Sequence, residues 1–330
     1  MLVLAFFFRP VPRPHVDTGY RMLMGTFARA VAVADDSNTA RTAVAAAFME
    51  LYEVDKLMSD YRTDSEITAV NHSASESPVR VSESTFHVLT TALYFSRLTD
   101  GAFDVTVGPL VDLWRQAAEA NSVPSDAELQ QARSKVGYDK LMLDANEMTV
   151  RFADDGMRLD LGGIAKGYAI DKAIEAMKKS GALGGMVDIG GDIRCFGTPP
   201  EQKTNWLIGL QDPNKPHDWL GTTKPALVLR LTDAAIATSG DYRRFVLIDS
   251  QEYSHILDTK TGRGSRALSS VTIICKKAID ADALATAVSV LGPQKGLDLI
   301  EKIPETEAIL ISAGPQFSLN KTTGAGVYIK

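Results

Sequence analysis

The chain has 330 residues, of which 45% are apolar and 23% charged, and its formal net charge at pH 7 is −6. These values are typical of a globular protein with ample core, and they argue against nucleic-acid partners and polybasic membrane patches, which need clustered positive charge. Two cysteines, Cys195 and Cys275, are too few for a disulfide scaffold or a zinc site. Their apolar surroundings favour buried free thiols, with a single disulfide as the alternative.

The first twenty residues are expected to be a leader and linker, followed by one domain over residues 21–330. Residues 1–8 are apolar but too short to span a membrane, and neither a preceding positive charge nor a cleavage site or lipid-accepting cysteine accompanies them. They are interpreted as the remnant of a signal segment or as a disordered leader. Residues 9–19 contain three prolines, which is typical of a linker.

The first half of the domain mixes strands and helices. In chain order we expect a strand over residues 22–33, a helix over 39–59, a helix from the N-cap Ser82 to Gly101, a strand over 101–110, a short helix with the capping box Ser125–Glu128, and a hairpin over 140–152.

Residues 158–171 predict a short apolar strand, a glycine turn and a helix. Gly162 and Gly163 allow the backbone to approach a ligand closely, and a helix start offers unpaired N–H groups to an anion. Lys166 in the first helical turn adds a positive charge suited to phosphate. The alternative is a tight turn with a solvated lysine, since the spacing is neither a P-loop nor a Rossmann fingerprint.

The second half is richer in strands. The expected elements are a strand over residues 186–196 broken at 188–192, strands over 206–210, 226–231, 235–238, 245–248, 271–275, 307–311 and 327–329, and a helix over 280–291 followed by one that opens at Pro293. Because strands outnumber strand–helix alternations, the fold class is predicted as α+β with largely antiparallel sheets and packed helices.

Polar stretches stand out against this apolar background. They are Met24-Gly25-Thr26, Asp60-Tyr61-Arg62, Ala102-Phe103-Asp104, Asp160 with Lys166, residues 254–258 and residues 282–286. Each has an ordinary alternative: Asp104 is equally suited to a turn, Tyr61 to the edge of the core, and His255 to satisfying a backbone carbonyl.

Asp282 and Thr286 are spaced i, i+4 and share one helix face. A carboxylate and a hydroxyl on one face suit a hard cation such as Mg²⁺. The alternative is that Asp282 is a first-turn acid favoured by the helix dipole. A metal, a lysine and a glycine turn together would meet the needs of a pyrophosphate substrate, whose charge must be offset during transfer.

Together these motifs closely resemble the ApbE family of FAD:protein FMN transferases, from about residue 24 to about residue 291. Four blocks at residues 159–167, 187–192, 238–244 and 254–258 are family-like in order and spacing. The resemblance implies an ApbE-like, T-fold-related single large domain.

The resemblance also implies a reaction: Mg²⁺-dependent transfer of FMN from FAD to a threonine or serine hydroxyl of an acceptor flavoprotein, such as a redox-pump subunit, with release of AMP. By motif match the FAD site would comprise Met24, Tyr61, Ala102, Phe103, Asp104, Asp160, Lys166 and Ile256. The metal would be held by the Gly163 carbonyl, Asp282 and Thr286. His255, Asp282 and Lys166 are the catalytic candidates, with His255 as base or orienter of the hydroxyl, while Tyr61 and Phe103 offer faces for ring stacking.

Two departures accompany the resemblance. Ala285 stands where some relatives carry an acid, and Thr259 stands where a proline often occurs. FAD hydrolysis to FMN and AMP, and FAD storage without turnover, are the alternative functions. The protein is expected to be a monomer or a homodimer. The family implies the periplasmic side of the inner membrane, and a cytoplasmic location stays open.

Overall fold

The computed structural model describes residues 12–200, 203–213, 225–240, 245–313 and 318–330. The expected leader at residues 1–8 lies outside the described residues, as do residues 241–244 of the family-like block at 238–244. The described chain forms one domain of helices and antiparallel sheets, which confirms the predicted α+β class.

A nine-stranded sheet runs through the domain, and all of its strand pairs are antiparallel. Its strands lie in the order β1 (His15–Asp17), β3 (Thr26–Val33), β7 (Gly184–Ile189), β8 (Asp192–Gly197), β11 (Ala234–Gly240), β14 (Leu268–Cys275), β15 (Glu307–Ser312) and β16 (Leu319–Lys321), and β2 (Arg21–Leu23) also pairs with β3.

Three smaller sheets and the helices complete the domain. The small sheets are β4 (Val79–Arg80), β6 (Thr149–Phe152) and β5 (Leu141–Asp144); β10 (Leu227–Leu231) with β9 (Trp206–Leu210); and β12 (Phe245–Ile248) with β13 (Gln251–Ser254). The helices are α1 (Ser37–Met58), α2 (Glu66–Ser73), α3 (Glu83–Leu98), α4 (Gly108–Glu119), α5 (Asp126–Arg133), α6 (Ala165–Lys179) and α7 (Ala278–Ile300), with 3₁₀ turns η1 (Tyr138–Lys140) and η3 (Thr323–Tyr328).

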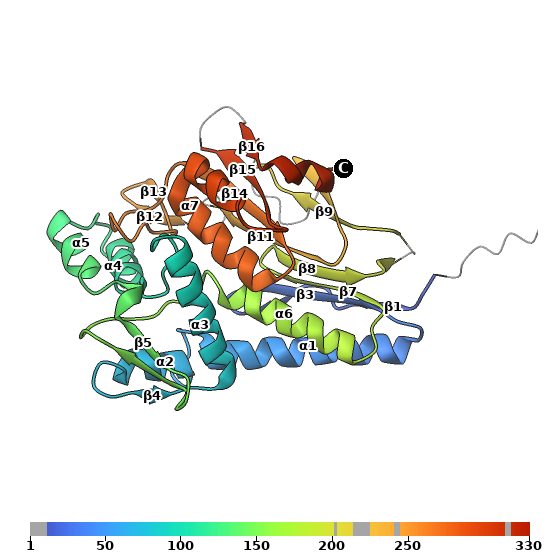
Figure 1. Ribbon diagram of the computed structural model, residues 1–330, viewed down its shortest axis with the longest axis horizontal. Coiled ribbons are helices and arrows are strands. Elements are labelled where there is room, and N and C mark those ends of the chain that lie inside the picture. Colours follow the sequence, from blue (N-terminus) through green and yellow to red (C-terminus); the bar gives the residue numbers. More distant parts are fainter. Residues whose placement is uncertain (1–11, 201–202, 214–224, 241–244, 314–317) are drawn as a thin grey trace, which may run out of the picture.

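Alternate residues of β3 face the two layers that pack on either side of the nine-stranded sheet. Ala28, Ala30 and Ala32 face the core that contains α1, α6 and α7, whereas Val31 faces the opposite side, where the β9–β10 hairpin packs through Trp206 and its neighbours. The small alanines let the helices approach the sheet closely. In Figure 1 the long helices cover one face of the sheet, and α2 to α5 gather at one end of the molecule.

Several helices and hairpins were predicted correctly from local signals. Ser82 and Ser125 each cap a helix through their side chains as predicted, and the capping box at Ser125 is present; Asp36 also caps α1, which was not predicted. The predicted hairpin over residues 140–152 is β5–β6. Cys195 and Cys275 are buried and free, and burial raises the pKa of each thiol to about 12, so the free-thiol interpretation is confirmed.

Four predicted elements differ from the structure in whole or in part. Residues 22–33 form a hairpin with a two-residue turn, because Met24 and Gly25 adopt φ values of 52° and 66°. Residues 101–107 form a loop before α4. The strand expected before Gly162 is reduced to a single parallel β-bridge between Arg158 and Val107. A 3₁₀ turn, η3, covers most of residues 327–329.

The linker expected over residues 9–19 is also wrong in part, since His15–Asp17 forms β1 at the sheet edge. A three-residue strand at an edge is held by backbone pairing, so its side chains need show no pattern.

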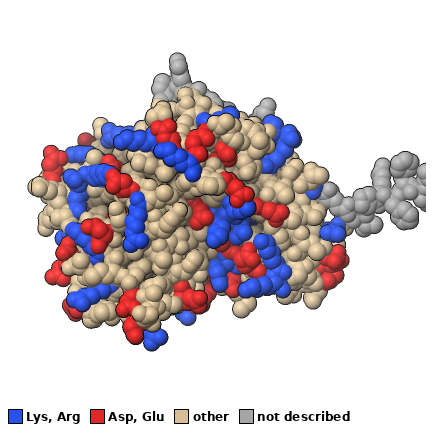
Figure 2. Space-filling view, in the orientation of Figure 1, with Lys and Arg blue, Asp and Glu red and all other residues tan. Residues whose placement is uncertain are grey.

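No helix among the described residues is both long and apolar enough to cross a membrane. In Figure 2 positive and negative side chains are interspersed on the face shown.

Candidate active site

A pocket of about 1200 Å³ opens between the sheet, α7 and the loops that precede α4 and α6. All of the residues predicted for FAD, metal or catalysis line it, although they come from widely separated parts of the chain: Met24, Tyr61, Ala102, Phe103, Asp104, Asp160, Gly163, Lys166, His255, Ile256, Asp282 and Thr286. The fold therefore brings together side chains that the sequence placed up to 262 positions apart, from Met24 to Thr286 (286 − 24).

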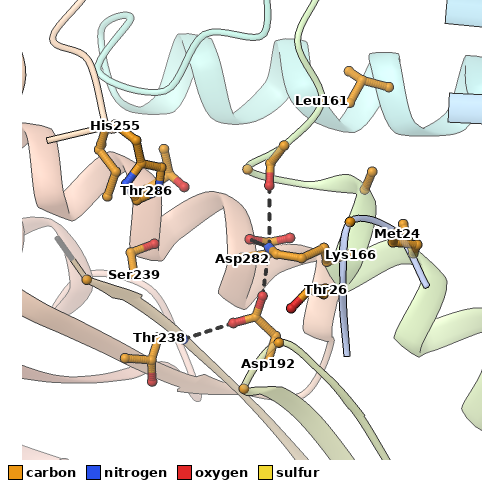
Figure 3. Close-up of a pocket in the computed structure, with 18 of the residues that line it drawn as sticks. Met24, Thr26, Leu161, Lys166, Asp192, Thr238, Ser239, His255, Asp282 and Thr286 are labelled. Carbon is orange, nitrogen blue, oxygen red and sulfur yellow. Dashed lines mark hydrogen bonds and ion pairs between the residues drawn. The ribbon is translucent and has the colours of Figure 1, made fainter. Parts of the chain in front are cut away.

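Lys166 lies between two buried carboxylates. Its Nζ is 2.7 Å from Asp192 Oδ2 and 2.9 Å from Asp282 Oδ1, and it also donates to the carbonyl oxygen of Gly162 at 3.4 Å (Figure 3). Burial alone would lower the pKa of Lys166, but the two carboxylates outweigh burial and raise that pKa above its ordinary value. Lys166 is therefore a permanently charged centre with its donors directed at protein oxygens, rather than the solvated lysine of the alternative interpretation.

Asp282 links the start of α6 to α7. Its Oδ2 accepts a hydrogen bond from the Gly167 amide at 3.0 Å, so the anion at this helix start is a side chain of the protein itself. Burial raises the pKa of Asp282 to about 6, against the opposing effect of Lys166. Because α7 begins at Ala278, Asp282 lies beyond its first turn and the dipole interpretation is wrong; Asp280 is the first-turn acid.

Gly163 makes room for the Thr286 hydroxyl. A Cβ on Gly163 would lie 2.8 Å from Thr286 Oγ1, so only a glycine lets this backbone and this hydroxyl meet without displacement. Thr286 lies one turn after Asp282 on α7, and the three residues line the same pocket. Asp282, Thr286 and Gly163 offer a carboxylate, a hydroxyl and a carbonyl group, each of which can bind a metal ion through oxygen.

That donor set fits Mg²⁺, which is commonly bound through one or two carboxylates with substrate phosphates and water completing its shell. Among the described residues, no group of three or more His, Cys, Asp or Glu side chains could hold a metal. Ala285 is fully buried and is not among the pocket-lining residues, so its departure from relatives leaves the described pocket wall intact.

Two predicted acids are held by local turns. Asp104 Oδ1 accepts from the amide and the hydroxyl of Thr106 at 2.8 and 2.7 Å, and Asp160 Oδ1 accepts from the Gly162 amide at 2.8 Å. The turn interpretation of Asp104 is therefore correct, while the same residue also lines the pocket. Burial raises the pKa of both carboxyl groups.

The two aromatic candidates differ in exposure. Phe103 is 3% exposed and lines the pocket from its buried wall, so little of its ring surface is open for stacking. Tyr61 is 77% exposed, which excludes the core-edge interpretation. Its hydroxyl accepts a hydrogen bond from Arg115 Nη2 at 3.0 Å.

His255 and Ile256 follow β13 directly. His255 is exposed and lines the pocket, and Figure 3 draws it on the other side of the view from Met24. Ile256 is buried, and its amide donates to Ser254 Oγ at 3.1 Å, which holds the segment in place. An exposed imidazole beside a pocket is accessible to a second reactant as well as to the first.

Sequence reasoning missed the contributions of Asp192 and Arg115. Asp192 was part of a glycine-rich block, but its partners, Lys166 and the Thr238 amide at 3.0 Å, are distant in sequence. Arg115 lies on an amphipathic helix where an arginine gives no local signal. Only the fold shows that both line the pocket.

The chain is similar to proteins of one known family. A model of the ApbE family matches residues 24–310. The FAD:protein FMN transferase of Treponema pallidum is 34% identical over 278 residues, covering 80% of this chain and 75% of that protein. The Vibrio cholerae enzyme of the same name is 37% identical over 254 residues, covering 76% and 74%.

The fold agrees as well. The crystal structure of the ApbE protein from Thermotoga maritima superposes with a TM-score of 0.85 at 31% identity, over 96% of this chain and 99% of that one. The match of the family model over most of the chain and the similarity to these relatives lead to one conclusion: the chain belongs to the ApbE family.

Proposed function

We propose that this protein is a transferase that moves FMN from FAD to a serine or threonine hydroxyl of an acceptor flavoprotein, with Mg²⁺ as cofactor and AMP as the second product. The observation that carries the proposal is the convergence of the predicted residues on one pocket, with a charged lysine, two carboxylates and an imidazole around it. The names of the relatives support the same reaction.

In this reaction the acceptor oxygen bonds to the phosphorus that carries the riboflavin part of FAD. The bond from that phosphorus to the bridging oxygen breaks, AMP leaves, and the hydroxyl proton passes to a base. An alcohol is a weak nucleophile at neutral pH, so a nearby base accelerates this step. His255, exposed at the pocket, is the residue we assign to accept or orient that proton.

Lys166 and the glycine turn organise the charged part of the site. The lysine keeps the Asp192 and Asp282 carboxylates in place, and Gly162 and Gly163 allow the backbone to lie close to a diphosphate. Gly163, Asp282 and Thr286 would hold Mg²⁺, which offsets the charge of a transferring phosphoryl group. Tyr61 and Met24 contribute to the walls against which FAD is bound.

The test uses the full chain, FAD, Mg²⁺ and a flavoprotein domain with a candidate hydroxyl. The acceptor should gain the mass of one FMN, and AMP should appear in equal amount only when the acceptor is present. AMP without modified acceptor would favour FAD hydrolysis, and intact FAD after prolonged incubation would favour storage. An acceptor whose hydroxyl residue is replaced by alanine is the matched control.

The cellular location and the assembly state are part of the proposal. We infer that the protein works at the cell envelope, next to an acceptor subunit, as a monomer or a homodimer. Mass spectrometry of the mature protein and of flavin-bearing proteins from the same cells tests the location and identifies the acceptor.

A further inference from the structure

Arg115, on α4, contacts both charged and aromatic side chains of the pocket. Its Cζ lies 5.0 Å from the centre of the Tyr61 ring, while its Nη2 donates to the Tyr61 hydroxyl at 3.0 Å. The same guanidinium donates to Asp60 Oδ2 at 3.1 and 3.2 Å and lies 3.8 Å from Asp160 Oδ2. One side chain therefore joins Tyr61 to two acids of the pocket.

An exposed ring such as that of Tyr61 gains from a partner that restrains it. The residue is 77% exposed, and it lies in the irregular segment between α1 and α2. An exposed aromatic side chain samples several rotamers, and fixing one costs conformational entropy at binding. Arg115 lies over one face of the ring and donates to its hydroxyl, so the face turned away from the guanidinium is the one available for stacking.

Arg115 is itself held before any ligand binds. The preceding residue, Trp114, is 2% exposed and its Nε1 donates to the Gly262 carbonyl at 2.8 Å, which anchors this turn of α4. Asp112 lies 3.8 Å from the Arg115 guanidinium and 3.3 Å from that of Arg158, which in turn lies 4.0 Å from Asp60. The arginine is thus fixed in a network of opposite charges.

We propose that Arg115 is a positioning residue that holds Tyr61 in the orientation in which its free face stacks on a ring of FAD, the flavin or the adenine. The inference rests on the proposed function, which makes FAD the ligand. Guanidinium groups stack on aromatic faces and form several hydrogen bonds at once, whereas a lysine ammonium is a compact point charge. The planar group is therefore essential to this role.

The test is a double-mutant cycle on FAD affinity. FAD binding is measured by flavin fluorescence without Mg²⁺ and without acceptor, so that no turnover occurs, for Arg115→Ala, Tyr61→Ala and the double variant. Each single variant should bind FAD about tenfold more weakly: Arg115→Ala leaves the Tyr61 ring to be ordered at binding, and Tyr61→Ala removes the stacked ring itself. The double variant should bind within about twofold of Tyr61→Ala, because the arginine acts through the ring.

The control is Arg158→Ala, which removes a guanidinium from the same ion network without touching Tyr61; its FAD affinity should stay within about twofold of wild type. Arg115→Lys should leave most of the loss in place. Steady-state kinetics should show the effect of Arg115→Ala in KM rather than kcat.

Two results would overturn the inference. Full recovery of FAD affinity in Arg115→Lys, or single effects that multiply in the double variant, would mean that Arg115 acts on FAD as a charge and not through Tyr61. If Arg115→Ala does not fold, the cycle is run with Arg115→Lys. Absence of FAD binding by the wild-type protein would instead refute the proposed function, so the two failures are distinguishable.

Discussion

Asp282→Asn is the substitution that most directly tests the charged centre of the pocket. Asparagine has nearly the size of aspartate, but one of its two polar groups is an NH₂ donor. In the structure Asp282 Oδ1 faces Lys166 Nζ at 2.9 Å and Oδ2 faces the Gly167 amide at 3.0 Å. The variant must therefore place a donor against a donor at one of these two contacts, while Lys166 keeps its partner Asp192 at 2.7 Å.

Two effects on stability oppose each other at neutral pH. Burial raises the pKa of Asp282 from 3.8 to about 6, so the buried anion destabilises the folded protein by about 3 kcal/mol at neutral pH. Asparagine is uncharged, so the variant is free of this destabilisation. Losing a hydrogen bond to a charged group costs about 1.5–3 kcal/mol. The free energy of unfolding should thus change by less than about 2 kcal/mol, while the carboxylate proposed for Mg²⁺ is gone.

The sign of the pH dependence follows from the same pKa. Between about pH 4 and pH 6 folded Asp282 binds a proton that the unfolded chain has released, so the wild type loses stability as pH rises through this window. Asparagine cannot titrate. The unfolding free energy of the wild type minus that of Asp282→Asn should therefore fall by about 3 kcal/mol across the window.

Denaturant unfolding of both proteins at several pH values measures that difference, and thermal unfolding with and without Mg²⁺ measures metal binding apart from activity. Asp282→Asn should show no Mg²⁺-dependent rise in Tm and no Mg²⁺-dependent transfer. Parallel pH profiles would refute the electrostatic reasoning. Mg²⁺-saturable transfer at the wild-type rate would refute the metal assignment.

Three further predictions concern other parts of the site. His255→Ala should lower FMN transfer about 100-fold or more while leaving the FAD dissociation constant nearly unchanged, as measured by single-turnover kinetics and flavin fluorescence. Gly163→Ala should weaken Mg²⁺ binding about tenfold in a thermal-shift titration, because the new Cβ would lie 2.8 Å from Thr286 Oγ1 and turn that hydroxyl away. Gly167→Ala should lower the free energy of unfolding by about 3 kcal/mol in denaturant, because its Cβ would lie 2.2 Å from the Ala278 carbonyl oxygen, which is backbone.

Each of these has an outcome that contradicts it. A loss confined to FAD affinity would move His255 from the reaction to the binding wall. Unchanged Mg²⁺ affinity in Gly163→Ala would separate Thr286 from the metal. For Gly167→Ala the matched control is Gly326→Ala, whose Cβ would meet only Lys321 Nζ at 3.6 Å; equal destabilisation by both would show that tight packing at Gly167 is not the cause.

Features that depend on neighbours within a few residues could be predicted from the amino-acid sequence. The caps at Ser82 and Ser125, the helical period of α1 and the alternation in β5–β6 are local, so they were visible without the fold. The order and spacing of the motifs likewise identified the family. Local patterns failed where φ was unusual, as at Met24, and where a short stretch that resembled a strand forms a loop, as at 101–107.

The charge distribution of the site depends on contacts that form when the chain folds. Lys166 and Asp282 are 116 positions apart, and they meet because α6 and α7 approach closely at Gly167, where any side chain would strike the Ala278 backbone. The same packing puts the Asp282 carboxylate on the Gly167 amide, where the sequence indicated a site for an external anion. Ion pairs and pKa values depend on burial and on partners distant along the chain, which no local pattern encodes.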